Sequence, residues 1–538
     1  MSLLVFFVPA NRAARRLRYL PFWFNELRYL PLPFLDTFIV QAYQESPAAA
    51  QRAINYLINS TNQQTLAARA MVKIAAGELT QCKTTRDMAT VADHLAWIPS
   101  PPPKELGTAL PQFVEVSQSV RAAQEATSLY RQHELLNAPI RQLQTLSESL
   151  AISRSATVAT TFRPIAQTWL STLQAAQRTL KERSRQSGEI PQVYIAGPPI
   201  DADSASDRFK GRQDLFREIE SLTLSPQPPV LLLHGGRRTG KSSLLNYLPR
   251  CIGSEIIPLH IDLQGAASAT TLRGLAESIS RLMIEAAQRS RNARFPYPDE
   301  DAIRRDPFPA LQQWFLDIER TIRGKRFLLC LDEFERLEEV VAETGSRAPL
   351  NFFRYVLQNR RQWILLFSGS HTLDELAPYW SDYLINTRPI RVSYLQEADA
   401  RELIQRPIDD FPDLYTPSAV DEIIRLTHCQ PYLVQLTCSA VVDHLNRHKR
   451  QQASLQDIHA VTPAVLEQAS ANLFRDRYRT ITDAERHCLQ QLLEEQSAAA
   501  MDKRVMRRLV QQREILHQVD EGYDFQIPLF KMYVESQL

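Results

Sequence analysis

The glycine-rich segment Gly235–Ser242, GGRRTGKS, constrains the fold of this 538-residue chain more than any other feature. It matches the pattern G-x-x-x-x-G-K-[ST], follows the apolar run VLLLH and precedes the helical pattern SLLNYL. A strand, a glycine turn and a helix in this order direct backbone N–H groups and a helix N-terminus toward an anion. The segment therefore predicts a phosphate site at the end of a strand. The flanking strand and helix disfavour the alternative, a glycine-rich turn without a ligand.

The residues of this turn have separate roles in the predicted nucleotide site. Glycines let the backbone turn around a phosphate, Lys241 reaches the outer phosphates, and Ser242 ligates a magnesium ion. No [NT]-K-x-D guanine signature occurs in the sequence, so the predicted cofactors are ATP or ADP with Mg²⁺. The loop residues predicted to bind the nucleotide are Gly235, Gly236, Arg237, Arg238, Thr239, Gly240, Lys241, Ser242 and Ser243.

An acid pair in the segment RFLLCLDEFE completes the predicted catalytic set. Asp332 follows the apolar run 327–331 and is predicted to hold the magnesium ion through water. Glu333 comes next and is predicted to polarise the attacking water as a general base, with Lys241 as the third catalytic residue. The alternative is a charged helix start, because acids favour that position.

Five short apolar runs alternate with helical patterns in the middle of the chain. They cover residues 230–234, 255–263, 327–331, 363–368 and 390–394. This alternation predicts a parallel sheet with helices on both faces. The fourth run ends in SGSHT, and a polar residue at such a strand end senses the γ-phosphate in P-loop ATPases with an additional central strand. Ser368 or Ser370 is the candidate here, and an ordinary turn is the alternative.

Composition limits the classes of partner and the compartment. The formal net charge of +2 argues against attraction of the whole protein to nucleic acid or anionic membrane. Six cysteines without a C-x-x-C pair indicate reduced thiols and a cytoplasmic protein. The sequence contains no run of 18 apolar residues, so no transmembrane segment is predicted. The aromatic N-terminal stretch is expected to form a helix that packs on its own domain. Peripheral membrane contact and membership of a larger polypeptide stay open as alternatives.

Motifs over residues 191–538 resemble those of STAND and archaeal-type AAA ATPases, with the origin-recognition ATPases as relatives. They are FKGR, the phosphate loop, LLCLDEFE, the SGS strand end, LQEADARELIQRP and LTHCQPYLVQLTCSAVVDHLN. The resemblance implies that Phe209, Gly211 and Arg212 pack beside the base. It also implies that Pro431, in a G-x-P motif, contacts the nucleotide. This sequence has Cys429 in place of the glycine, and a proline also occurs in helix first turns without any ligand.

The tail from Thr482 resembles a winged helix, since it reads as three helices and a strand hairpin. Basic residues crowd its middle, as a DNA-reading helix requires. They are Lys503, Arg504, Arg507, Arg508 and Arg513. A solvated helix face explains them equally, because acidic residues lie close by. In STAND proteins this domain more often clamps the nucleotide in the resting state, so DNA is the less favoured partner.

The predicted fold class is a multidomain protein with an all-α N-terminal region, an α/β P-loop NTPase core with a parallel sheet, a helical lid and a C-terminal winged helix. The predicted boundaries are 1–98 and 108–186 for two helical regions, 187–212 for a linker with the F-x-G-R segment, 213–395 for the core, 396–460 for the lid and 461–538 for the winged-helix-like domain.

The resemblance implies a slow, regulatory ATPase switch that is closed with ADP and open with ATP. Its partners are then a homo-oligomer or another protein, bound through the N-terminal helical region. Two alternatives stay open. One is a DNA-binding ATPase of the origin-recognition type, and the other is a scaffold that holds a nucleotide structurally.

Overall fold

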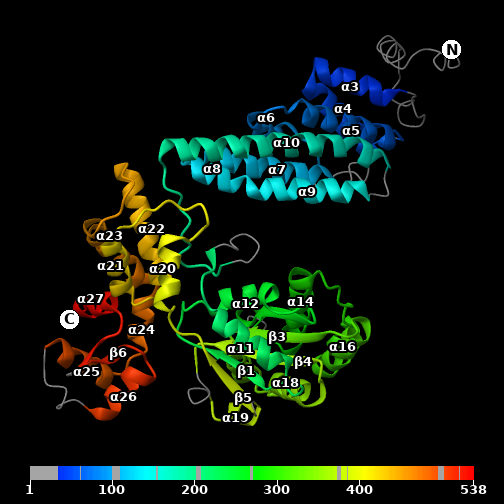
Figure 1. Cartoon of the computed structure of the whole chain (residues 1–538). Helices are drawn as coiled ribbons and strands as arrows, with labels where there is room; N and C mark the ends of the chain where they lie inside the picture. The colour runs from blue at the N-terminus through cyan, green and yellow to red at the C-terminus, as the bar shows by residue number, and fades with distance from the viewer. Residues whose placement is uncertain are drawn as a thin grey trace, which may run out of the picture. The chain divides into compact units, whose positions relative to one another are not determined.

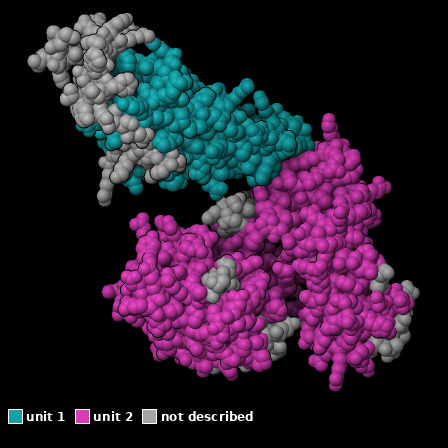
Figure 2. Space-filling model, turned by 180° about the vertical axis from the view of Figure 1, so that it is seen from behind, with its two compact units in different colours: residues 1–189 teal, residues 190–538 magenta. Residues whose placement is uncertain are grey.

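The computed structural model describes residues 34–60, 62–99, 109–152, 156–200, 208–266, 271–371, 377–383, 386–494, 502–519 and 522–537. The chain forms two compact units, Met1–Glu189 and Ile190–Leu538, which Figure 2 shows in different colours. The aromatic N-terminal segment up to residue 33 lies outside the described residues, as do residues 100–108 and residues 201–207 of the linker. No helix in the described ranges is long and apolar enough to cross a membrane.

All the elements described in the first unit are helices, as the sequence predicts (Figure 1). Their apolar faces share one core, in which the Phe113 and Trp169 rings meet edge to face with centroids 5.1 Å apart. The buried indole of Trp169 donates a hydrogen bond to the Leu79 carbonyl at 3.0 Å, which satisfies its polar atom. The helices are α3 (Leu35–Glu45), α4 (Pro47–Ser60), α5 (Gln64–Gln81), α6 (Thr85–His94), α7 (Ala109–Glu125), α8 (Leu129–Leu135), α9 (Asn137–Ala151) and α10 (Ala156–Ser187).

The second unit contains a five-stranded sheet with the order β2-β3-β4-β1-β5. Every neighbouring pair of strands is parallel, which confirms the predicted parallel sheet. The strand β4 lies between β1 and β3, so the ends of these three strands meet at one edge. The strands are β1 (Val230–His234), β2 (Ile256–Asp262), β3 (Arg326–Asp332), β4 (Trp363–Gly369) and β5 (Thr387–Arg391).

Helices cover both faces of this sheet because alternate residues of a strand point to opposite faces. In β1, Leu231 and Leu233 pack with α11 (Gln213–Leu224) and α12 (Lys241–Cys251). Their neighbours Val230 and Leu232 belong to the core on the opposite face. That core includes residues of α14 (Leu272–Arg291), α16 (Pro307–Thr321) and α18 (Ala348–Asn359). Short helices complete this part: α13 (Leu263–Ala266), α15 (Glu300–Arg305), α17 (Arg336–Thr344) and α19 (Trp380–Tyr383).

The fifth strand differs from the predicted range 390–394, because it begins at Thr387 and ends at Arg391. The Val392 N–H still donates to the His234 carbonyl at 2.8 Å. Beyond it, the carbonyls of Ser393 and Tyr394 accept hydrogen bonds from Arg212 in place of a strand neighbour. The strand ends earlier than the apolar pattern indicates because its neighbour β1 ends at His234, which pairs with Arg391, and Arg212 takes up the carbonyls beyond.

The remainder of the second unit is helical apart from one hairpin, in the residues that the structure describes (Figure 1). The predicted hairpin is present as β6 (Leu516–Val519) and β7 (Gly522–Phe525), which pair antiparallel. The helices are α20 (Glu397–Gln405), α21 (Pro417–Thr427), α22 (Pro431–His448), α23 (Leu455–Ala469), the π-helix η5 (Ser470–Phe474), α24 (Arg475–Arg479), α25 (Asp483–Leu493), α26 (Lys503–Gln511) and α27 (Pro528–Glu535).

Candidate nucleotide site

A cavity of about 420 Å³ lies at the turn between β1 and α12. Of the residues predicted from sequence, Arg237–Ser243, Phe209, Arg212, Glu333 and Pro431 line it. The other predicted residues, Gly211, Gly235, Gly236, Asp332 and Ser368, are not among its lining residues. Side chains from the C-terminal helices line it too, including Tyr432, Asn472 and Asp476.

The phosphate loop keeps its shape through its carbonyl groups. The carbonyl oxygens of Gly235 and Gly236 accept from Lys241 Nζ at 2.9 and 3.1 Å. Those of Arg238 and Thr239 accept from side chains outside the loop, Gln430 and Arg212, both at 3.1 Å. These hydrogen bonds hold the carbonyls of the turn in place, and an anion bound at the turn would accept from its backbone N–H groups.

Two glycines of the loop meet steric requirements that other residues do not. Gly240, the residue before α12, has φ +96°, in the left-handed region that favours glycine. A Cβ atom on Gly235 would lie 2.2 Å from the Val392 carbonyl oxygen. The glycine therefore lets the loop pass directly over the chain that follows β5.

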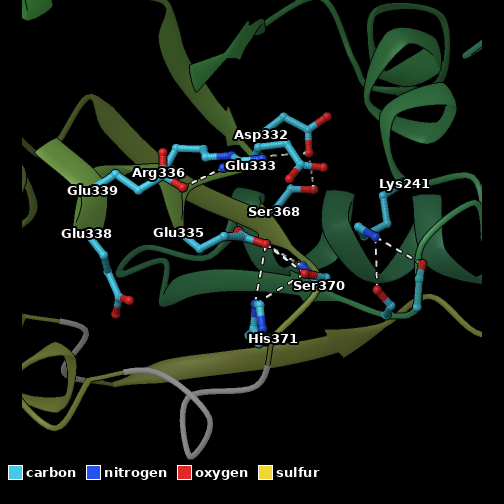
Figure 3. Close-up of polar contacts among 12 residues, drawn as sticks. Lys241, Asp332, Glu333, Glu335, Arg336, Glu338, Glu339, Ser368, Ser370 and His371 are labelled. Carbon is cyan, nitrogen blue, oxygen red and sulfur yellow. Dashed lines mark hydrogen bonds and ion pairs between the residues drawn. The ribbon is translucent and has the colours of Figure 1, made fainter. Parts of the chain in front are cut away.

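Lys241 is buried, and its ammonium group points to the loop carbonyls (Figure 3). Burial lowers its pKa, while the nearby carboxylates of Asp332, Glu333 and Glu335 act to raise it. The ammonium group is a charged donor, and the oxygens of a polyanionic ligand would accept from it more strongly than neutral carbonyls do.

Asp332 ends β3 as the sequence predicts, and its buried carboxylate accepts from two hydroxyl groups. Ser242 Oγ donates to Oδ2 and Ser368 Oγ donates to Oδ1, both at 2.6 Å. Burial acts to raise the pKa of this carboxyl, but hydrogen bonds from His260, Ser242 and Ser368 hold it below the ordinary value. The Ser242 hydroxyl and the ionised Asp332 are oxygen donors, which fit Mg²⁺ when phosphates and water supply its other ligands.

The two glutamates after Asp332 lie in different surroundings. Glu333 lines the cavity with φ +53°, and burial, then the charges of Glu335 and Asp332, raise its pKa. Glu335 accepts from the Ser370 hydroxyl at 2.8 Å and its backbone N–H at 2.9 Å, and lies 3.5 Å from His371 (Figure 3). Burial opposes ionisation, yet the hydrogen bonds of His371 and Ser370 lower its pKa to about 2. Glu333 is thus the more basic of the two.

The two serines considered as phosphate sensors have different partners. Ser368 is fully buried and bonds to Asp332, whereas Ser370 bonds to Glu335. Neither of them is among the residues that line the cavity. Ser368 is the one in direct contact with the acid expected to hold the metal ion.

The FKGR segment lies against the loop and against α12. The Phe209 ring stacks on the Tyr247 ring with centroids 4.3 Å apart. Arg212 points its guanidinium group at three carbonyls, those of Thr239, Ser393 and Tyr394, at 3.1, 2.5 and 3.3 Å. The arginine therefore joins the phosphate loop to the chain after β5, a role that its motif alone does not indicate.

The departure from glycine at Cys429 has a visible backbone consequence. Cys429 has φ +58°, in the region where glycine is favoured. The turn before α22 therefore keeps the conformation that a glycine would adopt, at some cost in strain for a residue with a Cβ atom. Pro431 follows as the first residue of α22 and lines the cavity.

Sequence reasoning missed the contacts between the loop arginines and the C-terminal helices. Arg237 forms an ion pair with Asp476 at 2.9 Å. Arg238 donates to the Asn472 carbonyl at 3.1 Å, and its guanidinium carbon lies 4.4 Å from the centroid of the Tyr432 ring. The only sequence signal for these contacts is the pair of arginines inside the glycine motif, since their partners lie about 190 to 240 residues further on.

A family model for novel STAND NTPase 1 matches residues 202–534, which is more than half of the chain. The chain belongs to this family. The resemblance found in the motifs is thereby confirmed, and family and fold are those of P-loop NTPases. No curated protein matches the sequence.

Several solved structures are weakly similar to this STAND NTPase. The Aeropyrum pernix ORC2 protein has 12% identity and a TM-score of 0.40, covering 65% of this chain and 98% of its own. The Aeropyrum pernix ORC1 protein in complex with DNA has 12% identity and a TM-score of 0.36, covering 62% and 94%. The Thermotoga maritima RuvB Holliday junction branch migration motor has 13% identity and a TM-score of 0.31, covering 62% and 97%. At these values the similarity carries no argument about function.

Proposed function

We propose that this STAND NTPase is a switch that binds ATP and ADP with Mg²⁺, hydrolyses ATP slowly, and changes its assembly or its partner with the nucleotide. Lys241 and the loop N–H groups bind the phosphates, and Ser242 and Asp332 hold the metal ion, which neutralises phosphate charge when bound. Glu333 accepts the proton of the attacking water. Ser368 donates a hydrogen bond to the Asp332 carboxylate, and Phe209, Gly211, Arg212 and Pro431 form the surroundings of the base.

The contacts of the loop arginines with the C-terminal helices support the switch. Arg237 and Arg238 belong to the turn that receives the phosphates, yet their side chains hold Asp476, Asn472 and Tyr432. A nucleotide adds negative charge next to these guanidinium groups and competes with their present partners. The same residues therefore respond to the ligand and retain the C-terminal helices, which is what a nucleotide-dependent clamp requires.

The magnitude of this clamp follows from its exposure. The Arg237–Asp476 pair is half exposed on both sides, at 66% and 50%, so it contributes roughly 0–1 kcal/mol. The cation–π contact of Arg238 with Tyr432 adds about 0.5–1 kcal/mol. Together they shift the equilibrium between held and released C-terminal helices by about tenfold. This is enough to change the populations of the two states but not to fix one of them.

The test changes the partners and leaves the phosphate loop intact. In Tyr432→Leu/Asp476→Ala, we expect faster amide exchange over residues 470–479 in ADP, and a larger share of oligomer in ATP. Arg304→Ala is the matched control, since it removes an exposed arginine that pairs with Asp301 on α15. Unchanged exchange and unchanged mass in both nucleotides, with nucleotide affinity retained, would show that these contacts are no clamp.

The basic face of α26 favours a second candidate, a DNA-binding ATPase in which the tail is a winged helix. Lys503, Arg504 and Arg507 are exposed there. Arg508 is exposed as well, but it and Arg513 lie 3.9 and 3.7 Å from the buried Glu485. A salt-dependent affinity for duplex DNA that is abolished when Lys503, Arg504 and Arg507 are all replaced by Gln would favour this candidate over the switch.

The remaining elements of the proposal concern partners and compartment. We assign partner or self-association to the N-terminal helical unit and a lid function to α20–α23, and we place the protein in the cytoplasm, since its six cysteines are free thiols. A third candidate is a scaffold with a structural nucleotide. This candidate predicts a stoichiometric nucleotide that is not turned over. Quantifying the co-purified nucleotide and measuring its hydrolysis would test it directly.

A further inference from the structure

His260, on β2, lies between the helix of the phosphate loop and the acid at the end of β3. Its Nδ1 atom is 2.8 Å from Asn246 Oδ1, and its Nε2 atom is 3.4 Å from Asp332 Oδ2. Both ring nitrogens therefore face oxygen acceptors, and the ring is oriented from two sides. The imidazole is mostly buried, with 21% of its side-chain surface exposed.

Asn246 fixes this arrangement from the other side. Its Nδ2 group donates to the Ile200 carbonyl at 3.1 Å, so its Oδ1 atom is the one that faces the histidine. Asn246 lies one turn after Ser242 on α12, which places it on the same side of the helix as the serine that contacts Asp332. The next serine, Ser243, accepts from the Ile200 N–H at 2.9 Å.

This series of contacts connects a wall of the cavity to the acid. The segment 195–200 contributes Ile195, Gly197, Pro198, Pro199 and Ile200 to the lining. A displacement of Ile200 changes the acceptor that orients Asn246, and Asn246 in turn orients the ring that contacts Asp332. The Asp332 carboxylate has few other orientations open to it, because its two oxygens also accept from Ser242 and Ser368.

We infer that His260 and Asn246 are positioning residues that hold the Asp332 carboxylate in the orientation that a magnesium–nucleotide complex requires. The inference rests on the proposed nucleotide site and deepens it, since it names what orients the acid. Removing a residue that hydrogen-bonds to a metal ligand typically lowers metal affinity or activity by roughly 10–100-fold. Asp332 without His260 keeps its serine contacts, so the carboxylate stays in place but turns more freely.

The test measures binding of a non-hydrolysable ATP analogue to the full chain by calorimetry, once with Mg²⁺ and once with EDTA. His260→Ala is expected to weaken binding by roughly tenfold or more with Mg²⁺ and to leave binding in EDTA unchanged. Asn246→Ala is expected to act in the same direction, and the double variant to bind no more weakly than His260→Ala. His260→Gln keeps an N–H donor and should recover part of the loss.

His459→Ala is the matched control, because this histidine also contacts a carboxylate, Glu422, at 3.0 Å, but on α23 and away from the cavity. Equal losses in Mg²⁺ and EDTA would overturn the inference, since they indicate a general structural role. So would unchanged binding in both single variants. If His260→Ala does not fold, His260→Gln and Asn246→Ala decide by the same comparison. A wild-type protein that binds no analogue in either condition would instead overturn the proposed function, and this inference with it.

Discussion

Replacing Glu333 by glutamine separates the proposed base from the rest of the site. The amide keeps the size of the side chain and leaves Asp332 and Ser242 unchanged, but it cannot accept a proton from water. General base catalysis contributes roughly 10²–10⁴-fold to a rate, so single-turnover hydrolysis is expected to slow by about a hundredfold or more. The ATP affinity should be retained, because Glu333 places no donor or cation on the phosphates.

The stability effect of this substitution follows from the pKa of the carboxyl. Burial and the neighbouring acids Glu335 and Asp332 raise the pKa of Glu333, so its ionised form is disfavoured in the folded state. A neutral amide removes this disadvantage. The free energy of unfolding at pH 7 is therefore expected to stay equal or to increase in Glu333→Gln.

Glu335→Gln is the matched comparison, since this glutamate lies two positions further on and its pKa is lowered, whereas that of Glu333 is raised. The hydrogen bonds of His371 and Ser370 lower the pKa of Glu335 from 4.5 to about 2 against the effect of burial. One pKa unit between the unfolded and the folded state corresponds to about 1.4 kcal/mol, so the lowered pKa of Glu335 stabilises the folded state by up to about 3 kcal/mol. This contribution is complete above pH 4.5 and is lost as the pH falls toward 2, so the difference from wild type should narrow over that interval.

The assay combines single-turnover hydrolysis of labelled ATP with urea unfolding of the same samples. Unfolding is followed by tryptophan fluorescence, to which Trp314, Trp363 and Trp380 of the sheet core contribute. Glu333→Gln should be slow and stable, and Glu335→Gln should be destabilised. Equal hydrolysis rates of wild type and Glu333→Gln would remove Glu333 from the catalytic role. A Glu335→Gln protein as stable as wild type at pH 7 would refute the assignment of Glu335 as a structural acid.

Two further outcomes test the phosphate loop and its support. Lys241→Ala is expected to abolish ATP binding, measured by calorimetry, because this lysine is the cation that the loop directs at the outer phosphates, and a retained affinity would contradict the phosphate site. Arg212→Lys keeps the charge but loses the planar guanidinium group that donates to three carbonyls. The free energy of unfolding of the second unit should therefore fall by about 1–3 kcal/mol, and the nucleotide affinity should fall with it. An unchanged melting temperature would show that water replaces these hydrogen bonds.

The parts of the fold that the sequence predicted well are those whose signal is local. Each apolar run of the sheet is flanked by turns, and β1 has the predicted bounds because its next residues are glycines. The predicted end of β5 is wrong by three residues, since its pairing partner β1 ends at His234 and the carbonyls beyond accept from Arg212, about 180 residues earlier. Local patterns do not contain such a partner, and only the folded chain brings it to the strand.

The candidate site follows the same division. The phosphate loop and the acid pair are contiguous motifs, and they meet because parallel strands end at one edge of the sheet. His260 could not be selected from sequence, because one histidine in an apolar run is more often a core residue than part of a site. Its contacts come from α12 and β3, 14 and 72 residues away. Asn472 and Asp476 likewise have no motif of their own.

The phosphate loop is the point at which three distant segments of the second unit meet. Arg212, before α11, bonds to the Thr239 carbonyl, and Gln430, before α22, bonds to the Arg238 carbonyl. Asp476, on α24, pairs with Arg237. Each contact acts on the backbone or on a side chain of the same short turn, so a ligand that reshapes the turn changes all three at once. Substitutions in the three segments should therefore not be additive in their effect on nucleotide affinity, because they share one conformational change.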